Sequence, residues 1–126
     1  MQIEFENLFN EQFISSYGKN FIVINEKKYF NKIILLNSVI DDCKDLKDLL
    51  NERFFEKIIN QFHDNEYNFI LFGTGKKTKK IPLKTYEFIV KNNIPFEVMN
   101  NIAAYKTYNI LLSQGKKILA FLDLET

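Results

Sequence analysis

The chain has 126 residues, 46% of them hydrophobic and 13 of them Phe, which is enough apolar material for a single domain (1–126) with its own core. The net charge is +1, without the large surplus of a typical nucleic-acid binder, and no run of 18 apolar residues predicts a membrane span. The first 11 residues carry three Glu and neither Lys nor Arg, the wrong charge for a signal or transit peptide. Cys43 is the single cysteine, which forbids an internal disulfide, fits a reducing compartment and leads us to expect a cytoplasmic protein.

The small net charge hides an asymmetry along the chain. Residues 1–66 hold 8 Lys and Arg against 12 Asp and Glu, a net charge of −4, whereas residues 67–126 hold 9 against 4, a net charge of +5. The two halves can form solvated faces that neutralise each other in the fold, or a basic patch for an anion or an acidic partner. The modest overall charge favours the first interpretation.

The N-terminal third predicts short extended segments. Residues 1–16 fit no single period and are expected to form an extended arm. The runs 21–24 and 28–30, joined by a polar turn, predict a β-hairpin, and the apolar run 33–36 predicts a buried strand. The charged segment 41–45 is expected to be a loop.

An amphipathic helix is predicted next, over 46–62, from apolar residues at intervals of three and four, with an interruption near Asn51. The apolar run 69–72 predicts a strand that stops at Gly73. A further helix opens at Ile81 and Pro82, because proline is well placed in a first turn. Its expected buried stripe consists of Leu83, Tyr86, Ile89 and Val90.

The remaining segments complete an alternation of strands and helices. Residues 96–99 predict a strand, Asn100 or Asn101 can cap the helix that follows, Gly115 ends that helix, and 117–122 predict the last strand. We therefore expect an α/β fold: a three-layer domain with a central mixed β-sheet, helices packed on it and an N-terminal β-hairpin.

The loop GTGKKT follows a strand and precedes a helix, which is the place of phosphate-binding loops. A Walker loop would need glycine at position 70, which is Ile, and a dinucleotide fingerprint would need glycine at position 78, which is Thr. Neither nucleotide motif is present. The loop can still bind an anion through Gly73, Thr74, Gly75, Lys76 and Lys77, or it can be a tight turn in which the glycines supply positive φ angles.

Five lysines lie close together after this loop, and they could hold a phosphate or an acidic protein surface, or remain a solvated run. They are Lys76, Lys77, Lys79, Lys80 and Lys84. No aromatic residues alternate with them as in single-strand binders, so nucleic acid is an unlikely partner.

The sequence gives little support for a metal site or a catalytic nucleophile. His63 is the single histidine, at the end of a predicted helix, where a positive ring suits the helix dipole. Cys43 lies 20 residues away without a ligand pattern. We expect no metal site, no cofactor and no cysteine–histidine pair, and an enzyme is less expected than a binding protein.

The predicted helix from Ala103 to Gln114 breaks a local rule, because Thr107 and Asn109 are poor helix formers in its interior. Such violations are frequent at functional sites. Alternatively, Thr107 bonds back to its own helix and Asn109 bonds a neighbouring loop.

Several segments together resemble the family of the NADH–ubiquinone oxidoreductase (complex I) assembly factor 3, which includes many uncharacterised bacterial and archaeal proteins. The resemblance rests on Tyr17, Gly18 and Phe21, on the run Phe69–Gly75 and above all on Ile94–Leu122. Matching residues are Glu97, Val98, Met99, Ala103, Ala104, Thr107, Tyr108, Asn109, Leu111 and Gly115, and the departures are Asn101 for Thr, Lys106 for Arg, Gln114 for Glu and Lys116 for Arg. The resemblance implies a three-layer fold around a mixed sheet, without established catalytic residues or a cofactor.

Two hypotheses follow for the function. The first is a non-catalytic protein-interaction or assembly-factor-like module, for respiratory or other membrane complexes, with a protein partner and with self-association left open. The alternative is a small-anion-binding protein or an enzyme that uses the GTGKK loop. Its site, for an anion or a partner, would lie among Gly73, Thr74, Gly75, Lys76, Lys77, Asn101, Thr107 and Asn109.

Overall fold

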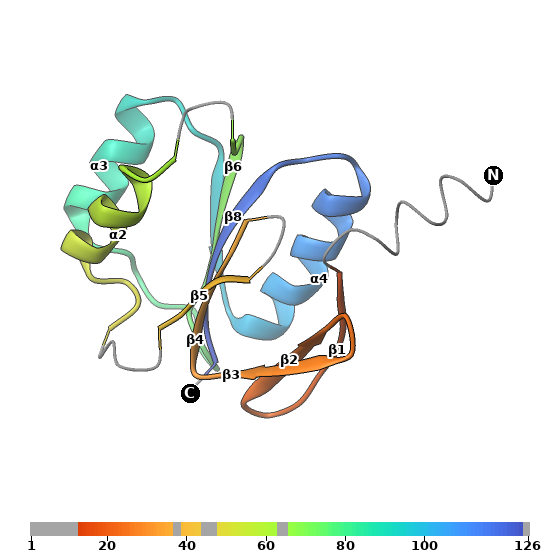
Figure 1. The fold of residues 1–126 in the computed structure, drawn as a ribbon. Coiled ribbons are helices and arrows are strands. Elements are labelled where there is room, and N and C mark those ends of the chain that lie inside the picture. Colours follow the sequence, from red (N-terminus) through yellow and green to blue (C-terminus); the bar gives the residue numbers. More distant parts are fainter. Residues whose placement is uncertain (1–12, 37–38, 44–47, 63–65, 125–126) are drawn as a thin grey trace.

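The computed structural model describes residues 13–36, 39–43, 48–62 and 66–124, and within them the chain forms two sheets and three helices (Figure 1). The smaller sheet is antiparallel, in the order β1 (Ile14–Tyr17), β2 (Phe21–Ile24), β3 (Lys27–Phe30). The larger sheet has the order β5 (Val39–Asp42), β4 (Lys32–Leu35), β8 (Ile118–Asp123), β6 (Phe69–Gly73), β7 (Phe96–Met99). The helices are α2 (Glu52–Ile59), α3 (Leu83–Lys91) and α4 (Asn101–Ser113).

The five-stranded sheet is mixed, and its connections place helices on both faces. Strand β4 is antiparallel to β5 and β8, whereas β8, β6 and β7 are mutually parallel. The chain steps outward from β6 to β7 through α3 and then back to β8 through α4. Because parallel crossovers keep one hand, reversing the direction of travel moves the second helix to the opposite face.

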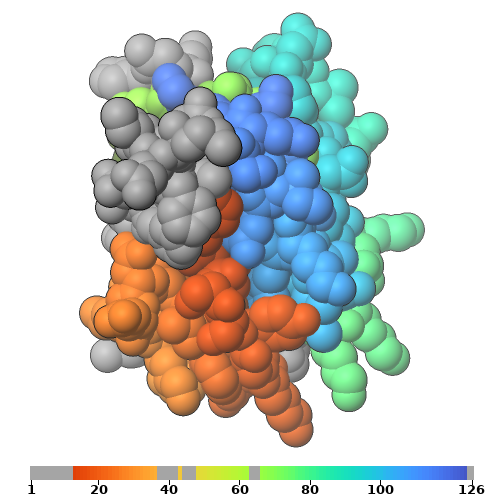
Figure 2. Space-filling view, turned by 90° about the vertical axis from the view of Figure 1, so that its right-hand side faces the viewer, coloured from red at the N-terminus to blue at the C-terminus, as the bar shows by residue number. Residues whose placement is uncertain are grey.

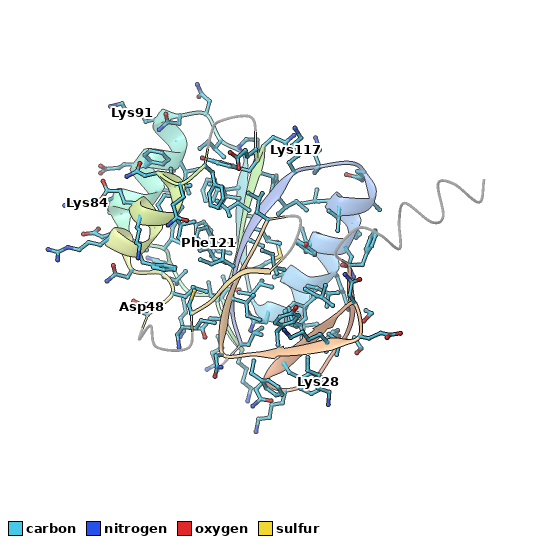
Figure 3. All side chains as sticks on the ribbon, viewed as in Figure 1. Lys28, Asp48, Lys84, Lys91, Lys117 and Phe121 are labelled. Atoms are coloured by element: carbon cyan, nitrogen blue, oxygen red, sulfur yellow. The ribbon has the colours of Figure 1, made fainter. Side chains whose placement is uncertain are left out.

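Helices α2 and α3 cover one face of the large sheet, and α4 covers the other, where the small sheet packs against it (Figure 1). Each face has its own apolar cluster. Between the sheet and the α2–α3 layer, the ring of Phe121 stacks on Phe72 at 5.2 Å and lies 5.6 Å from Phe55 (Figure 3). On the other face Tyr108 is the largest fully buried side chain. None of the three described helices has both the length and the apolar composition needed to cross a bilayer.

The expected fold class is confirmed: the sheet is mixed, helices pack on it, and β2 and β3 form the N-terminal hairpin. The hairpin turn has positive φ at Asn25 and Glu26, the backbone geometry that suits the twist of a two-residue turn. Asn100 caps α4 by accepting a hydrogen bond from the N–H of Ala103 at 3.0 Å.

Three expected boundaries were wrong. Residues 14–16 of the expected arm form strand β1 together with Tyr17, and β1 pairs with β2; residues 1–12 of the arm lie outside the described residues. The expected loop at 41–45 begins inside β5, an edge strand held by backbone pairing to β4, which a hydrophobic pattern cannot reveal. Helix α2 starts only at Glu52, since the side chain of Asn51 caps it by accepting from the N–H groups of Arg53 and Phe54.

The buried stripe expected for α3 was also wrong in three of its four residues. Ile89 is fully buried, but Leu83, Tyr86 and Val90 are exposed. The inward face is completed by Thr85 and Phe88 instead. The helix therefore carries apolar side chains on a side that no described element covers.

Candidate functional site

The loop after β6 is organised by Thr74, which is buried. Its N–H donates to the carbonyl of Met99 at 2.9 Å and so extends the pairing of β6 with β7. Its hydroxyl donates to the carbonyl of Lys77 at 2.7 Å and accepts from the N–H of Lys79 at 3.0 Å. These bonds fold residues 74–79 into a compact turn, and they use amide groups that a phosphate cradle would need.

Asn101 fastens this turn to the first turn of α4. The N–H of Gly75 donates to Asn101 Oδ1 at 2.8 Å, and the N–H of Asn101 donates to the carbonyl of Gly75 at 2.8 Å. Asn101 Nδ2 donates to the carbonyl of Asp123 at the end of β8. Gly75 has a φ of 100°, a conformation that glycine adopts without strain. The second glycine of the motif is therefore explained by the turn itself.

Gly73 is required by a close approach between β6 and α4. A Cβ at this position would lie 2.8 Å from both Asn101 Oδ1 and Leu122 Cδ2, and 3.1 Å from Ala104 Cβ. Such short contacts force a neighbour to move. The first glycine thus serves the packing of α4 on the sheet.

A cavity of about 310 Å³ lies beside this junction, where the β1–β2 turn, the loop after β6 and the start of α4 meet. It is lined by Gly18, Lys19, Gly75, Lys76, Asn100, Asn101, Ile102 and Tyr105. In Figure 2 the small sheet and α4 face the viewer, and the green segment that follows β6 projects at the lower right. Two lysines and the amino end of a helix give the cavity a positive potential.

Tyr105 is the titratable group in the wall of this cavity with a shifted pKa. Burial raises the pKa of its phenol from 10.0 to about 12, a hydrogen bond with the side chain of Asn101 lowers it, and the nearby Tyr17 and Asp123 raise it. The ring centroids of Tyr105 and Tyr17 are 5.0 Å apart. At neutral pH the phenol is therefore protonated and serves as a hydrogen-bonding group and not as a base.

The structure brings together only part of the predicted site. Asn101 contacts the glycine loop directly, whereas Thr107 and Asn109 lie about 9 and 12 Å further along α4. Asn109 binds Ile14 of β1 instead, accepting from its N–H at 2.9 Å and donating to its carbonyl at 2.8 Å. The expected partner of Asn109 was a neighbouring loop, whereas its partner in the structure is the edge strand β1. Thr107 is half-buried on the second turn of α4.

The predicted site lacked five contributors to the cavity: Gly18, Lys19, Asn100, Ile102 and Tyr105. They come from two segments more than 80 residues apart, and no local pattern connects them. The signal that could have found Tyr105 is its position one turn after Asn101, which puts both side chains on one helix face.

A larger hollow of about 570 Å³ lies where α2 and α3 end beside the start of β6. The described residues that line it carry no charged side chain. His63, which neighbours this end of α2, lies outside the described residues. Within the described ranges, no group of His, Cys, Asp and Glu has the composition of a metal site.

Comparison with known proteins shows which protein family has this sequence pattern. A family model described as a protein of unknown function (DUF498/DUF598) matches residues 14–122. The chain belongs to the DUF498/DUF598 family. The match to this family runs from the first residue of β1 to Leu122 in β8 and includes the glycine loop and α4. No curated protein matches the chain at a significant level.

Solved structures share the DUF498/DUF598 fold at low sequence identity. An outer membrane protein from Bartonella henselae is 19% identical, covers 90% of this chain and 95% of its own, and superposes with a TM-score of 0.76. A Xanthomonas campestris protein is 20% identical, with coverages of 88% and 83% and a TM-score of 0.72. A Bordetella pertussis protein described as an Mth938-like domain is 18% identical, with coverages of 93% and 87% and a TM-score of 0.67. These likenesses establish the fold.

Replacing Gly73 by alanine is expected to lower the free energy of unfolding by about 1–3 kcal/mol, because the new methyl group overlaps Asn101 and Leu122. The measurement is the midpoint of urea unfolding. Gly115→Asn is the control, since Gly115 has a φ of 80°, which asparagine tolerates, and no atom lies within 4 Å of its Cβ position. A Gly73→Ala variant as stable as the control would contradict the close approach of α4.

The raised pKa of Tyr105 predicts a loss of stability at high pH. Below pH 10 the phenol is neutral in both states; between 10 and about 12 it ionises in the unfolded chain first, so the free energy of unfolding falls as pH rises. Tyr105→Phe should make this fall shallower in urea unfolding measured at a series of alkaline pH values. An unchanged alkaline slope in the variant would show that Tyr105 ionises normally.

Proposed function

We propose that this protein is a non-catalytic protein-interaction module. The observation that carries the proposal is the uncovered apolar side of α3, where Leu83, Tyr86 and Val90 are 69%, 46% and 50% exposed. They are spaced three and four residues apart and so form a continuous stripe along the helix. A contiguous apolar patch of this kind is typical of a surface that a partner covers.

The exposed isoleucines of α4 do not form a comparable patch. Ile102 and Ile110 are exposed as well, but they are two turns apart and Lys106 lies between them on the same side. Single exposed apolar residues are ordinary on protein surfaces. The contrast favours α3 as the interaction surface.

The class of partner is proposed from the sequence resemblance to the complex I assembly factor 3 family. By that analogy the module would assist the assembly of a respiratory or other membrane complex, acting in the cytoplasm.

The test compares the apolar stripe with a matched site. Leu83→Gln combined with Val90→Gln should abolish retention of the partner from native extract, while the free energy of unfolding changes by about 1 kcal/mol or less, since both positions are exposed. Ile110→Gln is the control, because Ile110 is also exposed and helical but lies on α4. Retained proteins are quantified by mass spectrometry.

Each outcome of this comparison is decisive for the α3 surface. A protein retained by the unchanged chain and by Ile110→Gln but lost with the double variant supports it. Equal retention by all three forms excludes α3 as the interface, and retention of nothing by the unchanged chain contradicts the interaction proposal itself.

The second candidate function is small-anion binding, which the cavity favours over the loop alone. Lys19 and Lys76 reach the cavity from two different segments, and α4 directs its amino end there. The loop amides of Gly75 and Lys79 are already used within the protein. The N–H groups of Asn101 and Ala103 in the first turn of α4 are also bonded, so an anion would be held by the lysine side chains and the positive end of the helix dipole.

Titration with inorganic phosphate tests whether the cavity binds a small anion. Inorganic phosphate should raise the melting temperature of the unchanged chain, and Lys19→Gln combined with Lys76→Gln should remove the increase, because only a ligand that binds the native state stabilises it. Lys116→Gln, which changes an exposed lysine beyond the carboxyl end of α4, should leave the increase intact. Identical curves for the three proteins would exclude a specific site in this cavity.

A further inference from the structure

Strand β7 leaves one edge of the large sheet open. It is the last strand in the order of the sheet and pairs only with β6 among the described elements. The N–H of Ile70 donates to the carbonyl of Pro95 at 3.0 Å, and that of Thr74 to the carbonyl of Met99 at 2.9 Å. In a parallel ladder alternate residues face the neighbour, so the N–H and C=O groups of Phe96 and Val98 face outward.

The apolar stripe of α3 lies next to this open edge. Tyr86 and Phe96 form an edge-to-face ring pair with centroids 5.9 Å apart, which joins the stripe to β7. The opposite flank of α3 meets α2, through the rings of Phe55 and Phe88 at 5.8 Å and the ion pair of Glu52 with Lys84 at 3.9 Å. In Figure 3 Lys84 and Lys91 project from α3 into solvent, away from the sheet. Tyr86 thus connects the stripe to the strand edge.

We infer that an extended segment of a partner protein adds to β7 as a sixth strand of the large sheet. The segment would pair with the outward backbone groups of Phe96 and Val98 and bury its apolar side chains beside Tyr86, the residue of the stripe that contacts β7. Strand addition of this kind gains affinity from backbone hydrogen bonds and specificity from alternate side chains. The inference rests on the proposed interaction function and specifies the chemistry of its partner.

Glu97 determines which segment fits. Side chains alternate along β7: Phe96 and Val98 pack in the cluster on the α2–α3 side, so Glu97 lies on the α4 side, where it is exposed. A partner strand therefore fits with apolar residues toward α3 and a lysine or arginine opposite Glu97. Opposite charges across a strand pair are stabilising and like charges are destabilising.

The same residue disfavours a second copy of this chain as the occupant. In an antiparallel pairing of two β7 strands centred on Glu97, the two Glu97 carboxylates would lie opposite each other. Charged residues are a common means by which edge strands avoid self-association. The edge is thus protected against its own copy and remains available to a cationic strand.

The experiment uses two synthetic heptapeptides as probes, one alternating lysine with valine and the other alternating glutamate with valine. Each is titrated into the isotope-labelled full chain while amide resonances are recorded. The lysine peptide should bind about fivefold more tightly than the glutamate peptide, the effect of about 1 kcal/mol of charge pairing. It should also slow hydrogen exchange at the amides of Phe96 and Val98.

Two variants test the geometry and the charge separately. Val98→Pro removes an outward N–H while leaving the bonds to β6, and proline is tolerated on edge strands, so peptide binding should be lost with the fold retained. Glu97→Lys should reverse the preference and favour the glutamate peptide. An unreversed preference, or resonance changes that avoid β7, would overturn the inference.

The outcomes also separate this inference from the proposed function. If the double variant of α3 loses its protein partner but neither peptide perturbs β7, the interaction surface stands and strand addition fails. If sedimentation shows a dimer that Val98→Pro dissociates, a second copy occupies the edge and the cationic partner is excluded.

Discussion

The structure depends on the contact between Asn101 and Gly75, because it fixes the start of α4 against the carboxyl ends of the central strands. Asn101 accepts from Gly75, donates to the carbonyl of Asp123 and bonds Tyr105, so its amide can be buried without an unmet hydrogen bond. Gly73 supplies the space for this junction. The residues that first suggested a nucleotide loop are therefore largely occupied in holding a helix in place.

The two crossover helices, α3 and α4, have different surroundings, and this difference explains their different amino-acid compositions. Helix α4 lies between two sheets, so small and aromatic residues such as Ala104 and Tyr108 fill the space on more than one side. Helix α3 packs on one face of the large sheet beside α2, and Leu83, Tyr86 and Val90 remain exposed on it. These three side chains form the exposed stripe, which is why the proposed interaction surface is on α3 and not on α4.

Much of the architecture was predictable because most of the few glycine and proline residues in the second half of the chain lie at or beside the ends of elements. These residues are Gly73, Pro82, Pro95 and Gly115. The remainder depends on tertiary contacts. A helical period shows that α3 has an apolar side but not whether a neighbour covers it, and Leu83 and Val90 were misassigned for that reason. The cavity could not be predicted either, since its walls come from three segments, and the edge strand β5 is defined by its backbone pairing with β4.

The hydrogen bonds between Asn109 and Ile14 join residues 95 positions apart and connect the small sheet to α4. No strand of that sheet pairs with the large one within the part of the chain that the structure describes, yet Ile22 and Ile24 of β2 are buried in the same apolar cluster as α4 and the central strands. The small sheet is therefore held on α4 by apolar burial as well as by these two hydrogen bonds. The β1–β2 turn, which carries Lys19, is positioned by that packing, so the shape of the cavity depends on how the small sheet lies on α4.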